Sequence, residues 1–121
     1  MPLVINLGWM PPQLFRNRER TEHWGVRQKF SKQCREDSRI ATLASLMENQ
    51  IFRIPDNDIP ISIYFYPPDK RRRDVDGMHS AIKASLDGIA DALGIDDQRF
   101  NPTQLVRCNP QKGGKVKVII G

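Results

Sequence analysis

The chain has 121 residues, a formal net charge of +5, 39% hydrophobic residues and 27% charged residues. This length predicts one domain over residues 1–121, and the composition excludes an intrinsically disordered chain. No apolar run approaches the roughly 18 residues of a membrane span, so we expect no membrane contact, whereas the positive charge is compatible with a polyanionic partner.

The N-terminal part of the chain contains one short strand, one loop and one long helix. Residues 3–7 are β-prone and predict a strand. Residues 8–23 predict a loop rich in Arg and Asn, of a length that is often functional in a compact domain. From Trp24 to about Asn49 apolar residues recur at three-to-four spacing, which predicts a helix. The recurring residues are Phe30, Cys34, Ile40, Leu43 and Met47.

The remainder of the chain predicts three strands and a second helix after a turn region at 50–58. The expected strands are residues 59–66, 104–108 and 115–120, the last two joined by a turn with Gly113-Gly114. Residues 77–93 predict a helix that ends at Gly94. The order β-α-β-α-β-β predicts an α/β (α+β) fold with a small mixed sheet of about four strands packed with two main helices.

The two cysteines, Cys34 and Cys108, have no metal-binding spacing. This pattern favours two structural thiols in a reducing compartment. The N-terminal residues lack the basic segment and the length of a signal peptide, so we expect a cytoplasmic protein.

The basic–acidic run, residues 70–76, places four cations beside two acids in the order Lys-Arg-Arg-Arg-Asp-Val-Asp. Like charges repel, so folding alone rarely requires both groups in one short segment. Phosphodiester chemistry uses both, because cations hold the phosphate backbone and carboxylates hold a divalent metal. The leading hypothesis from these residues is a metal-dependent nuclease that acts on DNA.

Asp74 and Asp76 are candidate ligands of one metal ion, because side chains at i and i+2 of an extended segment share a face. Asp76 could equally cap the following helix, and the two roles are compatible. The turn at Gly94 could bring a third carboxylate, from Asp96 or Asp97, to the same metal. An all-carboxylate set suits Mg²⁺ and argues against Zn²⁺.

The helix at 77–93 carries a polar row roughly 130° away from its apolar stripe. The stripe consists of Met78, Ile82, Leu86, Ile89 and Leu93, and the row of Asp76, Ser80, Lys83 and Asp87. Lys83 could orient an attacking water or stabilise charge on the phosphate. The structural alternative is a solvated face with an ion pair between Lys83 and Asp87.

Arginine and lysine side chains in two segments are candidate contacts to the phosphate backbone. They are Lys70, Arg71, Arg72 and Arg73 of the basic–acidic run, and Arg16, Arg18 and Arg20 of the first loop. Arginine forks match phosphate oxygens well, although a solvated loop is the alternative for both groups. Trp24 could stack on a base, but a core position at the start of the first helix is the favoured interpretation.

These motifs together resemble the RusA family of Holliday junction resolvases, small endodeoxyribonucleases common in prophages. The resemblance covers most of the chain and is strongest over residues 68–77, 83–88 and 96–98. It implies a homodimer that binds four-way DNA junctions in recombination and repair and nicks them symmetrically. The implied cofactor is Mg²⁺, with Mn²⁺ as a substitute and no small-molecule cofactor.

The resemblance implies catalytic and metal-binding roles for Asp74, Asp76 and Asp97, and a catalytic role for Lys83. This chain has Gly77 where the family usually has Asn, and its lysine lies farther from the second acid than in shorter members. Whether the third acid is Asp97 or its neighbour stays open, with Asp97 favoured. These departures motivate an alternative, a branched-DNA-binding module with weak or no cleavage. A basic structural or RNA-associated protein is a third, less favoured interpretation.

Overall fold

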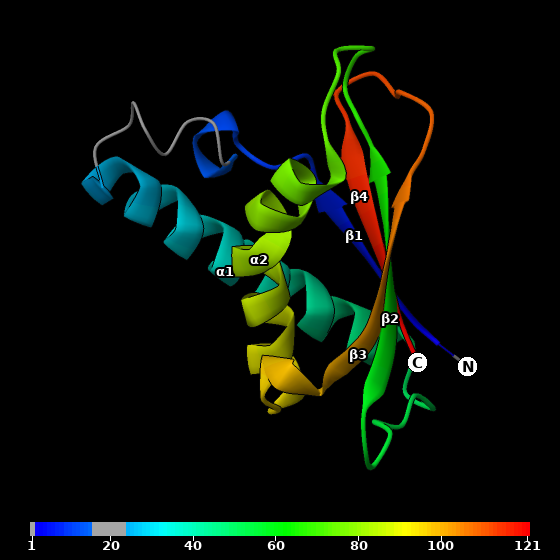
Figure 1. The fold of residues 1–121 in the computed structure, drawn as a ribbon. Coiled ribbons are helices and arrows are strands. Elements are labelled where there is room, and N and C mark those ends of the chain that lie inside the picture. The colour runs from blue at the N-terminus through cyan, green and yellow to red at the C-terminus, as the bar shows by residue number, and fades with distance from the viewer. Residues whose placement is uncertain (1, 16–23) are drawn as a thin grey trace.

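The computed structural model describes residues 2–15 and 24–121, and shows a four-stranded sheet with both long helices on one face (Figure 1). The strands are β1 (Leu3–Gly8), β2 (Ile59–Tyr66), β3 (Phe100–Arg107) and β4 (Lys115–Ile120). The helices are α1 (Trp24–Glu48) and α2 (Val75–Leu93), with short 3₁₀ turns η1 (Pro12–Leu14) and η3 (Asp97–Arg99). The predicted α+β fold and the order β-α-β-α-β-β are confirmed.

The sheet is mixed, with the strand order β1-β4-β2-β3. β4 pairs antiparallel with both β1 and β2, whereas β2 pairs parallel with β3. A parallel pair needs a long crossover connection, and α2 supplies it. The last two strands are joined through the predicted Gly113-Gly114 turn, but β2 lies between them, so they do not form a hairpin.

The core lies between the sheet and α2, and follows the two periodicities of the sequence. Alternate residues of β2 and β4 are buried on the helix-covered side. The predicted stripe of α2 is buried throughout, together with Ala81 and Ser85. The helix ends at Gly94, which has the left-handed φ of 70° that only glycine adopts without strain.

The predicted apolar stripe of α1 is wrong in its C-terminal half. Ile40 and Met47 are 54% and 76% exposed, whereas Ser38 and Thr42 are fully buried. The Ser38 hydroxyl donates to the Ser85 carbonyl of α2 at 2.7 Å, and the Thr42 hydroxyl donates to the Ser38 carbonyl at 2.7 Å. Small hydroxyl residues satisfy their own hydrogen bonds here and let the two helices approach closely.

The helices approach closely at Gly88 of α2. A Cβ atom at this position would stand 2.0 Å from the Arg35 carbonyl oxygen and 2.0 Å from the Ser38 hydroxyl. The glycine is therefore required for packing. None of the described helices is both long and apolar enough to cross a membrane.

Candidate active site along helix α2

The basic–acidic run lies in the connection between β2 and α2, where Asp69 folds it into a compact turn. The Asp69 carboxylate accepts the Arg71 backbone N–H at 2.9 Å and pairs with the Arg73 guanidinium at 3.0 Å. These partners hold the pKa of Asp69 below its usual value, the Arg71 amide contributing most. The Arg73 side chain is only 16% exposed, so this residue stabilises the turn.

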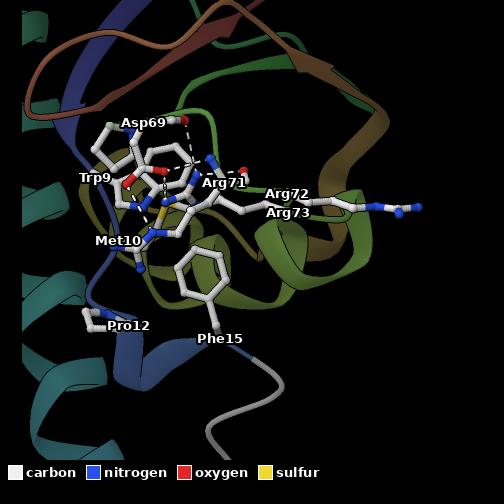
Figure 2. A pocket seen from close by; sticks show the side chains of 9 residues that line it. Trp9, Met10, Pro12, Phe15, Asp69, Arg71, Arg72 and Arg73 are labelled. Atoms are coloured by element: carbon white, nitrogen blue, oxygen red, sulfur yellow. Dashed lines mark hydrogen bonds and ion pairs between the residues drawn. The ribbon is translucent and has the colours of Figure 1, made fainter.

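The remaining cations of the run are available to a ligand. Lys70, Arg71 and Arg72 are exposed, and the Arg71 side chain is 84% exposed despite a 3.6 Å ion pair with Asp69. Figure 2 shows Arg72 extending away from the other labelled side chains. The predicted DNA contacts in the first loop, Arg16, Arg18 and Arg20, lie outside the described residues.

The first two predicted acids lie together at the N-terminus of α2. Asp74 is the N-cap, and its Oδ1 accepts the Gly77 backbone N–H at 2.6 Å. Asp76 is exposed in the first turn of the helix, which begins at Val75, so the predicted extended segment from Asp74 to Asp76 is wrong. The cap role that the sequence offered to Asp76 therefore belongs to Asp74. Both carboxylates lie at the positive end of the helix dipole, where a phosphate is also stabilised.

The polar row of α2 borders a groove between the two helices. This α1–α2 groove has a volume of about 560 Å³, and α2 lines it with Ser80, Lys83 and Asp87. The facing side chains of α1 are mostly cationic or polar, and are Arg27, Gln28, Ser31, Lys32 and Arg35. The groove therefore presents an excess of positive charge, which suits a bound phosphate.

Asp97 lies near Asp87, at the far end of α2 from Asp76. Burial, the negative charge of Asp97 and a hydrogen bond with Asp97 raise the pKa of Asp87, while Arg35 and Lys83 act in the opposite direction. Arg35 itself is held by Asp91 through two bonds of 2.6 and 2.9 Å. Two carboxylates in contact attract a proton or a cation.

The structure thus arranges the acids in two pairs along α2. Eleven residues separate Asp76 from Asp87, which is about 16 Å along a helix axis. Within residues 2–15 and 24–121, no three acidic, His or Cys side chains are grouped to hold a metal. Each pair offers oxygen ligands alone, and Mg²⁺ is commonly held by one or two carboxylates together with substrate phosphate. The donor chemistry therefore fits Mg²⁺ at either pair, and the repulsion between Asp87 and Asp97 favours a cation there.

Three contacts in this region were not identified from the sequence. Asp69 organises the basic–acidic run, Asp87 pairs with Asp97, and Arg35 reaches Asp91 across 56 positions of sequence. The four-residue spacing of Asp69 and Arg73 was a usable local signal. Contacts between α1 and α2 left no such signal, because they depend on how the two helices cross.

Comparison with known proteins places the chain in a family through a relative, although no family model matches the chain. A protein of Xylella fastidiosa, described as an uncharacterized protein, is 32% identical over 116 residues, which span 96% of this chain and 74% of the relative. Identity at this level over nearly the whole chain indicates common descent and a shared fold. The chain belongs to the same family as this Xylella fastidiosa protein.

Proposed function

We propose that the protein is a metal-dependent endodeoxyribonuclease that resolves four-way DNA junctions by symmetric paired nicks. The proposal joins the resemblance to RusA resolvases with one structural observation. Exposed cations at 70–72 directly precede two carboxylates at the positive end of α2. A phosphate held by these cations would lie beside oxygen ligands for a divalent metal.

In this proposal Asp74 and Asp76 hold Mg²⁺ or Mn²⁺. The metal would polarise the scissile phosphate and lower the pKa of an attacking water. The Gly77 amide fixes one oxygen of the Asp74 carboxylate and leaves the other free to act as a ligand. Lys70, Arg71 and Arg72 hold the DNA backbone beside the scissile bond.

Lys83 acts from the α1–α2 groove in this proposal, and Asp97 acts from beside Asp87, which lines the groove. The Lys83 ammonium stabilises the charge of a phosphate bound in the groove. Asp97 remains a candidate metal ligand, with Asp87 as its acidic neighbour. A homodimer supplies the two related sites that paired nicks require, and molar mass in solution tests this part of the proposal.

Cleavage of a labelled four-way junction, beside a linear duplex of matched sequence, tests the proposal. We expect nicks on the junction alone, in Mg²⁺ and not in EDTA. Asp76→Asn should retain junction binding and lose cleavage by at least about 100-fold, because metal stabilisation is worth several kcal/mol. Asp56→Asn removes an exposed acid from the turn before β2 and serves as the control, with cleavage unchanged. Equal cleavage by Asp76→Asn and the unmodified chain would contradict the assignment.

A branched-DNA-binding module without cleavage is the second candidate. The separation of the two acidic pairs along α2 favours it, because neither pair alone supplies three carboxylates. It predicts tight junction binding with no nicks in either Mg²⁺ or Mn²⁺. Metal-dependent turnover of many junctions by each protein molecule would reject it.

A further inference from the structure

A cavity with aromatic walls adjoins the basic–acidic run. This aromatic pocket has a volume of about 360 Å³, and its walls include Trp9, Met10, Phe15 and Pro68 (Figure 2). Residues 69 and 71–73 form its polar part. The pocket therefore combines apolar, aromatic surface with arginine side chains at one site.

The aromatic wall of the pocket is held in place by packing on several sides. The Trp9 ring stacks against Phe15 at 6.2 Å between centroids and meets the edge of the buried Phe65 ring at 6.4 Å. The guanidinium of Arg73 lies 5.5 Å from the centre of the Trp9 ring, and Asp69 fixes that guanidinium. A ligand would thus meet a pocket that is already formed.

The turn before β4 supports the same wall from a distant part of the sequence. A Cβ atom at Gly114 would stand 2.9 Å from Trp9 Cβ and 3.1 Å from Pro68 Cδ, and the φ of +68° also requires glycine. The Gln111 backbone N–H donates to the Pro67 carbonyl at 2.8 Å and ties this turn to the end of β2. Figure 1 shows the connection from β2 to α2 and the turn before β4 at the same end of the sheet.

The pocket borders the acidic pair at the start of α2. Phe15 Cδ1 lies 3.8 Å from the point where a Cβ on Gly77 would stand, and Asp74 Oδ1 lies 2.7 Å from it. An occupant of the pocket is therefore adjacent to the first turn of α2. A group that is covalently attached to this occupant could reach the Asp74 carboxylate.

The chemistry of the pocket selects a flat apolar ring that carries a negatively charged attachment. Aromatic walls stack on the face of any nucleobase, whatever its sequence. The exposed Arg71 guanidinium at the pocket supplies the partner for a phosphate. The volume lies at the lower end of the roughly 300–1,000 Å³ range of ligand sites, which suits a single base with part of its sugar.

We propose that the aromatic pocket binds one unstacked nucleobase of DNA and thereby places the adjoining phosphate at Asp74 and Asp76. This inference rests on the proposed function for its substrate. Bases at a branch point are easier to unstack than bases within a duplex, so the pocket favours branched over linear DNA.

Photo-crosslinking of the unmodified chain tests the inference directly. The probes are a four-way junction and a single-stranded oligonucleotide, each carrying 5-iododeoxyuridine. We expect crosslinks to Trp9 or Phe15 with both probes, because only a base in the pocket would stack on these rings. Crosslinks confined to other segments would overturn the inference.

Binding by a matched pair of variants gives a second, independent test. Phe15→Leu keeps an apolar side chain but removes one aromatic wall, whereas Phe100→Leu makes the same change at the half-buried start of β3. We expect Phe15→Leu to bind the single strand and the junction roughly tenfold more weakly, with unchanged affinity for linear duplex. We expect Phe100→Leu to bind like the unmodified chain, with thermal unfolding confirming that both variants fold. Unchanged affinity of Phe15→Leu for both probes would overturn the inference.

The single-stranded probe separates this inference from the proposed function. Base binding in the pocket without junction cleavage would reject the nuclease and retain the pocket. Junction cleavage by a chain that crosslinks only outside the pocket would retain the nuclease and reject base binding in the pocket.

Discussion

Asp74 combines two roles at the residue scale, because the carboxylate that caps α2 is also a proposed metal ligand. Gly77 makes this geometry available, since a Cβ there would stand 2.7 Å from Asp74 Oδ1. The proposed resemblance to RusA resolvases implies Asn at this position. Glycine has a low helix propensity, but its lack of a side chain at position 77 leaves room for the Asp74 carboxylate that caps α2.

Substitution of Asp74 separates the cap from the ligand. Asp74→Asn should leave the free energy of unfolding nearly unchanged, because Asn caps helices about as well as Asp. Asp74→Ala should lower it by about 1 kcal/mol. Both variants should lose metal-dependent cleavage, as urea unfolding and junction assays would measure. Full cleavage by Asp74→Asn would contradict the ligand role, and equal stability of the two variants would contradict the cap.

The Asp87–Asp97 pair makes stability depend on pH. Burial and the charge of Asp97 raise the pKa of Asp87, so the folded chain holds this proton more tightly than the unfolded chain. The free energy of unfolding therefore falls as the pH rises from the ordinary aspartate pKa through the raised value. Above that range, an ionised and repelled Asp87 destabilises the fold.

Asp87→Asn should remove the pH dependence of the free energy of unfolding that the raised pKa of Asp87 causes. In EDTA at neutral pH we expect its free energy of unfolding to rise by less than about 1 kcal/mol, because Asp87 is only partly buried and solvent screens the repulsion. Urea unfolding between about pH 4 and pH 8 measures the effect. Asp56→Asn, at an exposed turn, should change little and serves as the control. A loss of stability in Asp87→Asn would show that the ion pairing of Asp87 outweighs its repulsion from Asp97.

At the element scale, the crossing of α1 and α2 positions both walls of the α1–α2 groove. The helices meet at Gly88, where the Arg35 carbonyl and the Ser38 hydroxyl leave no room for a side chain. Arg35 also reaches Asp91, on the next turn of α2. The placement of the groove cations relative to Lys83 thus depends on one glycine contact.

Gly88→Ala should destabilise the protein by about 1–3 kcal/mol, the usual cost of overpacking a tight core contact. The clash is with backbone, so rotation of a side chain cannot relieve it. Gly8→Ala is the matched control, because nothing lies within 4 Å of a Cβ at that position. Thermal unfolding would compare the two variants. Equal stability of Gly88→Ala and Gly8→Ala would show that the helices can separate at little cost.

At the scale of the whole molecule, features that depend on local sequence patterns were predicted better than features that depend on long-range contacts. The order of elements, the buried stripe of α2 and the stop at Gly94 follow from periodicity and cap chemistry, and all are confirmed. The inner face of α1 was assigned wrongly in its C-terminal half, because Ser38 and Thr42 are buried for close helix packing, which hydrophobicity does not reveal.

The strand order and the long-range contacts of the candidate site could not be predicted from the sequence. The sequence placed Asp74 and Asp76 just before a helix that begins at residue 77, whereas Asp74 caps α2 and Asp76 lies in its first turn. The pairing of Asp97 with Asp87 depends on how the chain turns after α2 and continues into β3. The position of Trp9 beside Arg73 likewise depends on the assembled sheet.

The most direct test of the account is to map nicks on the separate strands of a four-way junction in Mg²⁺. Strand-specific labels would locate every nick for the unmodified chain and for Asp76→Asn at equal junction occupancy. We expect paired nicks at symmetry-related positions on opposite strands, and their loss in Asp76→Asn. Unpaired nicks, or equal cutting of the linear duplex, would contradict it.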